Sequence, residues 1–447
     1  MNAPVAQTLS SQTAVPSDLP NLPPLIETSI GDAPAALMTM QDAGVPSRVL
    51  TDLACKLAAT VSQFDTAWAV AQLRLPLHLT EKIFWELKQE KLVEVLGQDG
   101  PYCYRYTITN LGREHARRLM EICGYIGPAP VSLESYCAML THAMQNRPSI
   151  TSASVREALG SLVVPDDTVE IASLAAASAR SLFLFGPPGN GKTTLGRALH
   201  QVMGDSIWLP HCLSVGDTVI RLYDSHCHHL VDVPDDLSTK IDQRWMLIQR
   251  PMMVAGGEMT MEELDLSYSP SLRFYEAPPH LKANGGLFLI DDFGRQRIDP
   301  HQLLNRWIIP LEHRIDHLSL HSGQKIVVPF ELFLIVATNL QVSEVSDPAF
   351  LRRMGYRLHL ASPTQQQYAQ IFQAYADDQS IVVPPGMIDS ILNRYEQENR
   401  DLRASEPRDL LERVLDISRL RQRPVDLNDD TLDLAWKGYF GAMGRHN

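Results

Sequence analysis

The chain of 447 residues lacks several features that would place it in a specialised class of protein. No apolar run approaches the ~20 residues that a membrane-spanning helix needs, so no membrane insertion is expected. The first residues have neither the positive start nor the apolar stretch of a secretory signal, and we expect a cytoplasmic location. The six cysteines are scattered and form no C-x-x-C pair, which argues against a disulfide framework or a zinc ribbon.

An excess of positive charge is also missing. The net charge of −13 disfavours a surface that binds nucleic acid throughout, although it leaves room for a local basic patch. With 45% hydrophobic and 20% charged residues, the composition is that of a globular protein. The length exceeds what one ordinary core accommodates and predicts about two or three domains.

Composition and periodicity divide the N-terminal third into three segments. Residues 1–44 are rich in Ala, Pro, Ser and Thr without a sustained period, which predicts a disordered tail. Residues 45–122 combine helical periodicity with two β-rich runs around the turn "GQDGP", a pattern that resembles a winged helix. Residues 123–149 begin with a Gly/Pro-rich stretch, interpreted as a hinge, and continue into a connecting helix. Thr109 and Ser132 are expected to cap the helices that follow them.

A winged helix can read DNA, and the charges of this one favour another role. The helix before the predicted wing carries Glu81, Glu86 and Glu90 against Lys82 and Lys88, so on balance it repels phosphates. The basic side chains beyond the wing are Arg105, Arg113, Arg117 and Arg118. Protein docking or a structural role is therefore favoured, and DNA binding is the alternative.

The strongest motif in the chain is "GPPGNGKT", which fits G-x-x-x-x-G-K-[ST] in full. The apolar run 181–185 predicts a buried strand before it, and "TTLGRALH" predicts a helix after it. In such a loop, backbone N–H groups and the helix N-terminus bind phosphates, Lys192 reaches the β- and γ-phosphates, and the Thr193 hydroxyl contacts Mg²⁺. The predicted nucleotide-binding residues are Gly186, Pro187, Pro188, Gly189, Asn190, Gly191, Lys192, Thr193 and Thr194.

Two adjacent carboxylates, Asp291 and Asp292, follow the apolar run 287–290. A buried parallel strand would bring both to the sheet edge where ligands bind. We expect Asp291 to hold Mg²⁺ together with Thr193, and Asp292 to orient the attacking water. Because aspartate is about one methylene shorter than glutamate, three alternatives stay open: a closer loop, slow hydrolysis, or a base supplied by Glu258 or Glu276. A structural N-cap pair is a further alternative.

The motifs "GPPGNGKT", "LFLIDD" and "LFLIVATN", in that order, together resemble the AAA+ ATPases over about residues 150–447. The resemblance implies an α/β fold, with a three-layer P-loop domain around a parallel sheet in residues 150–362 and a helical lid in residues 363–447. It also implies ATP and Mg²⁺ as cofactors and a homo-hexameric ring whose active sites are shared between subunits.

The same resemblance assigns further catalytic residues. Asn339 matches sensor 1, whose amide contacts the γ-phosphate or the attacking water. Arg352 and Arg353 lie where these proteins carry the arginine finger that enters the neighbouring subunit's site, and the sequence does not distinguish between the two. Arg408, near the start of the helix expected at 404–420, matches sensor 2.

A long insertion separates "SIWLP" (206–210), taken as the neighbour of the phosphate-loop strand, from the carboxylate strand. With a hairpin expected just before the sensor 1 strand, it resembles the AAA+ branch that includes MoxR-like proteins. Insertions of that branch line the pore of a ring. Phe274 and Tyr275 are therefore candidate contacts to a protein client, with core packing as the alternative.

The motifs "RFYEAP", "LKANGG", "IDDFGRQ" and "AFLRR" make the resemblance more specific. They match a bacterial group of predicted ATPases with chaperone activity, associated with Flp pilus assembly, which implies remodelling of a protein client with the N-terminal unit docking client or adaptor. A nucleotide-gated scaffold with slow turnover is the other alternative. The segment 226–229, His-Cys-His-His, has no second ligand group at a zinc spacing and is interpreted as a solvated loop.

Overall fold

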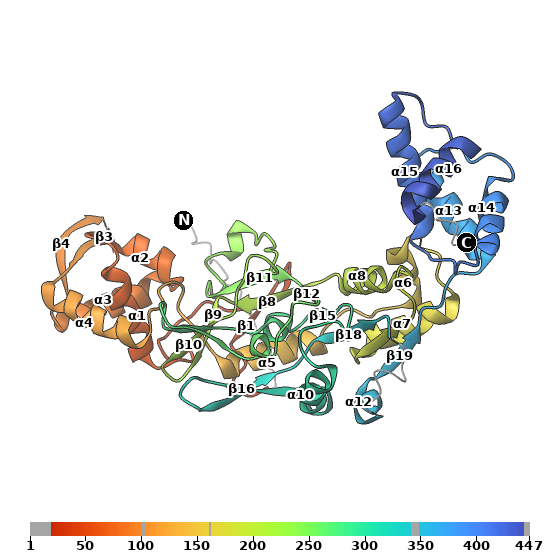
Figure 1. Cartoon of the computed structure of the whole chain (residues 1–447). Coiled ribbons are helices and arrows are strands. Elements are labelled where there is room, and N and C mark those ends of the chain that lie inside the picture. The colour runs from red at the N-terminus through yellow and green to blue at the C-terminus, as the bar shows by residue number, and fades with distance from the viewer. Residues whose placement is uncertain (1–18, 101–102, 161, 341–347, 442–447) are drawn as a thin grey trace, which may run out of the picture.

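The computed structural model describes residues 19–100, 103–160, 162–340 and 348–441. At its centre lies a five-stranded sheet in the order β12, β15, β18, β7, β19, with every neighbouring pair parallel (Figure 1). The strands are β12 (Met252–Ala255), β15 (Leu287–Ile290), β18 (Phe333–Thr338), β7 (Leu182–Phe185) and β19 (Tyr356–His359). Apolar runs such as β15 and β18 are buried on both faces, as central parallel strands require. The predicted α/β class is confirmed.

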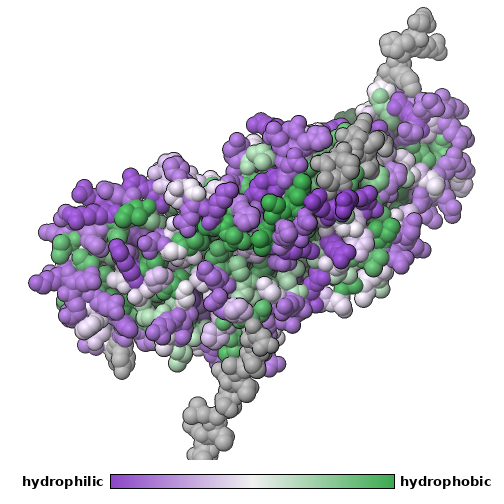
Figure 2. Space-filling view, turned by 90° about the horizontal axis from the view of Figure 1, so that it is seen from below, coloured by the Kyte–Doolittle hydropathy of each residue, from purple (hydrophilic) through white to green (hydrophobic). Residues whose placement is uncertain are grey.

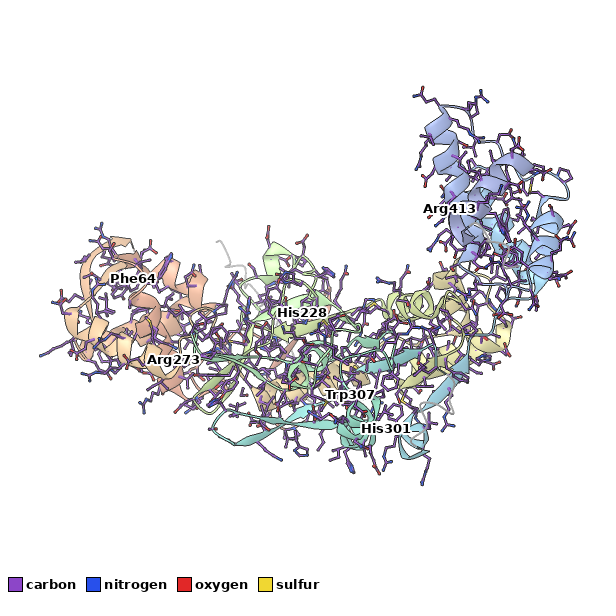
Figure 3. The ribbon with its side chains drawn as sticks, viewed as in Figure 1. Phe64, His228, Arg273, His301, Trp307 and Arg413 are labelled. Atoms are coloured by element: carbon purple, nitrogen blue, oxygen red, sulfur yellow. The ribbon has the colours of Figure 1, made fainter. Side chains whose placement is uncertain are left out.

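Helices cover both faces of this sheet and give it three layers. On one face, α6 (Ser152–Leu159), α7 (Asp166–Ser178) and α8 (Lys192–Met203) pack against Leu287 and Leu289. On the other face, α10 (Pro300–His313) and α12 (Pro348–Arg353) pack against Phe288 and Ile290, and Trp307 of α10 lies in this layer (Figure 3). Successive residues of one strand thus pack against helices on opposite faces of the sheet, because side chains alternate along a strand.

The C-terminal helices form a separate helical unit with its own core. They are α13 (Gln365–Asp378), α14 (Met387–Gln397), α15 (Glu406–Arg421) and α16 (Asp429–Phe440). The first begins at a capping box in which the Thr364 and Gln367 side chains satisfy each other's backbone N–H groups. Figure 1 shows this unit standing clear of the sheet, at the far end of the molecule from the N-terminal helices. The predicted helical C-terminal region is confirmed.

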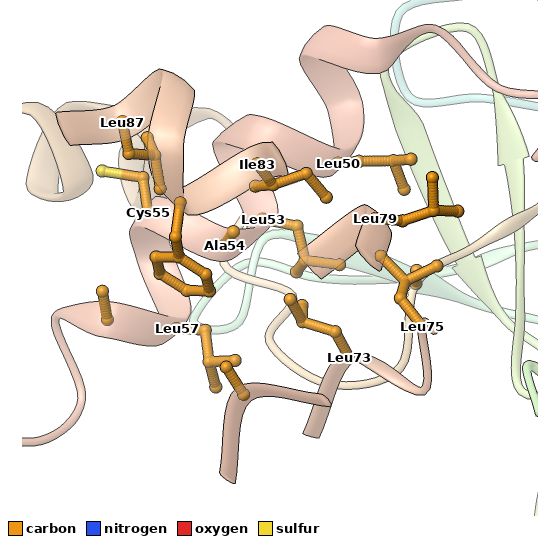
Figure 4. Packing of buried hydrophobic residues seen from close by; sticks show 14 of the residues in the cluster. Leu50, Leu53, Ala54, Cys55, Leu57, Leu73, Leu75, Leu79, Ile83 and Leu87 are labelled. Atoms are coloured by element: carbon orange, nitrogen blue, oxygen red, sulfur yellow. The ribbon is translucent and has the colours of Figure 1, made fainter. Parts of the chain in front are cut away.

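The N-terminal helical unit packs four helices and a short sheet around a hydrophobic core (Figure 4). Its elements in chain order are α1 (Ser47–Ala58), β3 (Phe64–Asp65), α2 (Thr66–Leu73), α3 (Leu77–Gln89), β4 (Val93–Gly100), β5 (Cys103–Ile108) and α4 (Asn110–Ile122). The strands pair antiparallel in the order β3, β5, β4. Thr109 caps α4 as predicted, since its hydroxyl accepts the Gly112 N–H at 2.9 Å.

The insertion builds a second lobe beside the parallel sheet, with its own core. One sheet has the order β13 (Ser267–Ser269), β14 (Phe274–Glu276), β10 (Thr218–Arg221), β9 (Cys212–Val215), β6 (Val131–Ser132). Two further pairs are β8 (Ser206–Pro210) with β11 (Trp245–Gln249) and the predicted hairpin of β16 (Ile315–Ser319) with β17 (Lys325–Pro329). Helix α5 (Leu133–Gln145), capped by Ser132 as predicted, completes the core. The short helices are η1 (Asp235–Leu237), η2 (Glu262–Leu264) and α9 (Pro279–Lys282).

The strand "SIWLP" does not join the parallel sheet, contrary to the expectation from the sequence. It forms β8 and pairs antiparallel with β11, while β12 takes the edge position next to β15. The apolar pattern of both segments is that of a strand, and a pattern shows that a segment is a strand without showing which partner it has. The edge strand therefore comes from within the insertion.

The predicted disorder of residues 1–44 is wrong for the part that the structure describes. Residues Leu25–Thr28 (β1) and Gly31–Pro34 (β2) form an antiparallel hairpin, with Leu25 and Ala33 buried in the core of the second lobe. The Trp208 indole N–H donates to the Asp32 carbonyl at 3.0 Å. These partners lie far away in the sequence, so local composition could not reveal them.

The stretch interpreted as a hinge, residues 124–132, is instead a packed junction. Tyr125, Ala129 and Val131 are buried, and Val131 and Ser132 pair with β9. Arg273 of the second lobe donates to the Glu121 carbonyl at the end of α4, and Figure 3 shows it between the N-terminal helices and the lobe. Glycine and proline here make tight turns within a packed interface, and a hinge requires few buried contacts.

Surface hydropathy agrees with this division into units. In Figure 2 hydrophilic residues prevail towards the two ends of the molecule, and hydrophobic residues gather along the middle of the face shown. Within the described ranges, none of the helices has the length and apolarity that crossing a membrane demands.

Candidate nucleotide site

The loop of residues 186–191 joins β7 to α8 at the C-terminal edge of the parallel sheet. Gly186 has φ 140° and Gly189 has φ 81°. A Cβ at these positions would come within 2.2 Å of the Leu360 carbonyl oxygen and 2.6 Å of the Ser405 Oγ, respectively. Glycine is thus needed for both conformation and space. The first N–H groups of α8 face the loop and suit an anion.

Lys192, the first residue of α8, is only 7% exposed. Its Nζ donates to the Gly186 carbonyl (2.9 Å), the Pro187 carbonyl (2.9 Å) and the Asn339 Oδ1 (2.7 Å). Burial lowers the pKa of Lys192, and the nearby carboxylates Asp291 and Asp292 oppose that shift. The ammonium group is therefore held by neutral oxygens, and a phosphate would give this buried cation an anionic partner.

Asp291 meets Thr193 at the end of β15. Its Oδ2 accepts the Thr193 Oγ1–H at 2.7 Å, and its Oδ1 accepts the Asp292 N–H at 3.0 Å. A hydroxyl and a carboxylate side by side are oxygen ligands of the kind that Mg²⁺ prefers. Across the residues that the structure describes there is no cluster of three or more His, Cys, Asp or Glu side chains suited to a metal. That sparse ligand set fits Mg²⁺, which keeps several waters and takes phosphate oxygens.

Asp292 and Asn339 are joined across the ends of β15 and β18. Asp292 adopts φ 50°, a left-handed conformation that aspartate tolerates better than most residues. Its exposed carboxylate accepts the Asn339 Nδ2–H at 2.7 Å, so the Asn339 amide bridges Lys192 and Asp292. Asp299 caps α10, so neither carboxylate caps that helix.

These side chains line a cleft of about 940 Å³ that extends to the C-terminal helices. One end holds the phosphate loop, Asp291, Asp292 and Asn339. The cleft is also lined by apolar residues that the sequence analysis missed: Leu159, Leu162, Val164, Pro165, Ile371, Ala374 and Tyr375. An apolar wall beside a phosphate-binding loop suits a flat aromatic base. No motif marks these residues, because the wall forms only when α13 packs opposite the segment before β7.

Arg408 lines the same cleft from the first turn of α15. Its guanidinium lies 3.1 Å from the Asp409 carboxylate, and that hydrogen bond raises the pKa of Arg408 further above neutrality. The side chain is about half exposed, which leaves it room to turn towards a bound phosphate.

Arg352 and Arg353 end α12 and do not line this cleft. The Arg353 Nε donates to the Glu312 Oε2 of α10 at 3.1 Å, whereas Arg352 is exposed. Neither is placed to act on its own subunit's nucleotide, which is the placement expected of an arginine that acts in a neighbouring subunit.

Neither carboxylate proposed as an alternative base lines the cleft. Glu276 belongs to the second lobe, where it accepts hydrogen bonds from Lys282 and Arg221, both at 2.8 Å. Glu258 lies in the exposed turn after β12. The expectation that either could supply the base is therefore not supported, whereas Asp292 lines the cleft.

Two further interpretations of the insertion are wrong in part. Tyr275 is 8% exposed and its hydroxyl accepts the His321 N–H, while Phe274 packs edge-on against Tyr125, so core packing explains both aromatics better than contact with a client. The segment 226–229 is not solvated throughout. His228 is 2% exposed and contacts the Lys282 carbonyl at 2.9 Å (Figure 3).

A family model described as "Domain of unknown function (DUF8689)" matches residues 364–438, the C-terminal helices. No curated protein matches the chain.

Among solved structures, the RuvB Holliday junction branch migration motor of Thermotoga maritima is similar at 15% identity, covering 65% of this chain and 72% of that chain with a TM-score of 0.35. NtrX from Brucella abortus is similar at 12% identity, over 66% and 59% of the two chains, with a TM-score of 0.37. NtrX was also solved in complex with ATP, and that structure is similar at 12% identity over 64% and 54% of the chains, with a TM-score of 0.36. With TM-scores this low, the likenesses say nothing about activity.

Proposed function

We propose that this chain is an AAA+ ATPase that binds ATP with Mg²⁺ and hydrolyses it. One observation carries the proposal: the ends of three neighbouring strands bring Lys192, Asn339, Asp292, Asp291 and Thr193 together through hydrogen bonds of 2.7 Å. A phosphate loop alone indicates nucleotide binding. The carboxylates and the amide beside it supply what hydrolysis needs in addition.

The roles follow from these positions. The backbone of residues 186–191 and Lys192 bind the phosphates, and the apolar wall with Ile371 and Tyr375 takes the base. Thr193 and Asp291 would hold Mg²⁺, which when bound draws charge from the β- and γ-phosphates. Asp292, steadied by Asn339, orients and polarises the attacking water.

We propose further that the chain works as a homo-oligomeric ring, a hexamer by family resemblance. Support comes from Arg352 and Arg353, which lie outside their own subunit's cleft. Since Arg353 already pairs with Glu312, Arg352 is the better candidate for the finger that enters a neighbour's site.

Remodelling of a protein client is the proposed output of the cycle, with a link to pilus assembly as the family resemblance implies. The order of helices and strands in residues 47–122 supports a winged-helix-like unit. We assign it a docking role because the two lysines of α3 are matched by two glutamates, with Glu90 directly after the helix, a balance that does not favour phosphate binding.

The test is binding and turnover of the full chain. Calorimetry with ATP and Mg²⁺ is expected to show saturable binding, and steady-state phosphate release is expected to show turnover. Lys192→Ala removes the one buried cation of the loop that faces the phosphates and is expected to weaken binding at least tenfold. Lys240→Ala, on an exposed loop of the second lobe, is the matched control. Binding that survives Lys192→Ala unchanged would overturn the assignment.

A further inference from the structure

The C-terminal helices contact the phosphate loop directly, through the turn of residues 403–405 that precedes α15. The Ala404 N–H donates to the Asn190 Oδ1 at 3.2 Å, and the Ser405 N–H donates to the Gly189 carbonyl at 2.9 Å. The nearest atom to a Cβ built on Gly189 is the Ser405 Oγ, at 2.6 Å. The turn and the loop therefore fit together closely, and a shift of one requires a shift of the other.

Asn190 also contacts the segment through which the chain enters the C-terminal helices. Its Nδ2 lies 3.5 Å from the carbonyl oxygen of Leu360, between β19 and α13. One side-chain amide of the phosphate loop thus touches both the segment that leads into α13 and the turn that leads into α15. Residue 190 is one of the unconstrained positions of the loop motif, so the motif itself assigns it no such role.

The turn 403–405 owes its shape to a buried carboxylate. Glu406 is 3% exposed, and its Oε2 accepts the Tyr395 hydroxyl at 2.7 Å and the Arg403 N–H at 3.2 Å. The Tyr368 hydroxyl in turn donates to the Tyr395 hydroxyl at 3.2 Å. A buried carboxylate is costly unless it is hydrogen-bonded, and here the bond to the Arg403 N–H ties it to the turn.

Glu406 connects the hydrogen bonds of Tyr368, Tyr395 and Arg403 to the cleft. Arg408 lies two residues further along the same first turn of α15 and faces the cleft. Burial raises the pKa of Glu406, while the bonds from Tyr395 and Arg403 oppose that shift.

We propose that Asn190 and Glu406 are positioning residues that couple the phosphate loop to the C-terminal helices. Glu406 holds the turn of residues 403–405 in the conformation that contacts the phosphate loop. Asn190 is the residue of the loop whose side chain makes that contact. A nucleotide that orders the loop thereby fixes the start of α15 and the place of Arg408. This coupling rests on the proposed function, since it needs a nucleotide on the loop.

Hydrogen–deuterium exchange of the full chain, with and without ATPγS and Mg²⁺, tests the coupling. In the unaltered chain, protection is expected in residues 186–195 and also in residues 401–410. In Asn190→Ala, which keeps every backbone N–H of the loop, the nucleotide-dependent protection of 401–410 is expected to fall by more than that of 186–195. Asn393→Ala, an exposed asparagine of α14, is the matched control and keeps both.

Conservative replacement separates positioning from general stability. Glu406→Gln keeps an oxygen that can accept from Tyr395 and Arg403, so it is expected to retain the protection of 401–410. Glu406→Ala is expected to lose it and to raise the KM for ATP about 2- to 10-fold, the effect of one hydrogen bond. Tyr395→Phe removes one donor and keeps the core volume, so it replaces Glu406→Ala if that variant does not fold.

The outcomes separate the coupling from the proposed function. If the unaltered chain shows no protection at 186–195, nucleotide binding itself fails and the coupling fails with it. If 186–195 is protected but Asn190→Ala and Glu406→Ala protect 401–410 as the unaltered chain does, the coupling alone is overturned.

Discussion

Asn339 lies between the two charged side chains on which the proposed chemistry depends. Its Oδ1 accepts from Lys192 and its Nδ2 donates to Asp292, both at 2.7 Å, and these opposite partners fix the orientation of the amide. A γ-phosphate that draws the Lys192 ammonium towards itself would leave the Asn339 oxygen without its donor. The same amide could then contact the water that Asp292 orients. The position of the Asn339 side chain would therefore depend on whether a γ-phosphate is bound.

Asp292→Asn removes the negative charge of the proposed base and keeps its size. Turnover is expected to fall about 100-fold or more, because a positioned base contributes about that factor, while ATP binding stays within about twofold. Phosphate release and calorimetry on the same preparation measure the two quantities. Asp299→Asn, a change at the cap of α10, is a control for nearby structure. Unchanged turnover with intact binding would remove Asp292 from the mechanism.

Lys282 joins two carboxylates of the second lobe, with Nζ at 2.8 Å from both Asp224 and Glu276. Burial raises the pKa of each carboxyl, but the hydrogen bonds and charges around it, with Lys282 foremost among them, together outweigh burial and lower both pKa values. Carboxyls with lowered pKa values stabilise the fold above their unfolded pKa values of about 4, and that stabilisation is lost as pH falls further.

Lys282→Met should therefore lower the free energy of unfolding by about 2 kcal/mol at pH 7, and by less at about pH 3. Urea unfolding at both values measures the difference. Lys240→Met, at an exposed lysine, serves as the control. A difference from the unaltered chain that is as large at pH 3 as at pH 7 would contradict the assignment.

At the scale of elements, the β1–β2 hairpin joins the second lobe although it precedes that lobe by a whole helical unit. Leu25 is 2% exposed there. Leu25→Ala is expected to cost about 2–5 kcal/mol, the usual range for a buried leucine. Thermal or urea unfolding measures it, with Met38→Ala as the control because Met38 is 74% exposed. A Leu25 variant as stable as the control would mean that the hairpin contributes little to the fold.

The sequence predicted two kinds of element. Some have partners close by in the chain, and others belong to motifs whose order along the chain is typical of one fold. The strand, loop and helix around Lys192 are contiguous, and Asp291 and Asn339 follow strands whose order implied that they would meet. The partner of β8, the packing of Tyr125 and the apolar wall at Ile371 could not be predicted in this way. Each depends on contacts between segments far apart in the chain. Hydrophobic periodicity indicates that a residue is buried, but it does not indicate which residues pack against it.

At the scale of the whole molecule, the proposed sharing of active sites between subunits predicts that two inactive variants can rescue each other. A Lys192→Ala subunit lacks its own nucleotide site but retains its finger, and an Arg352→Ala subunit has the reverse defect. Mixed in equal amounts, they are expected to release phosphate faster than either does alone, because some interfaces combine an intact site with an intact finger. The comparison is the same mixing experiment with Arg353→Ala in place of Arg352→Ala. A mixture no faster than the mean of its two components would argue against action between subunits.

The N-terminal helices share their core with the second lobe, since Cys212 of β9 and Val219 of β10 pack among their leucines. Because the two units share a core, a tilt of the lobe would carry the helical unit with it. A spectroscopic label on α3 would sweep a wider arc than the same label on β10. If the unit docks a client as proposed, that client would be displaced further than the lobe itself.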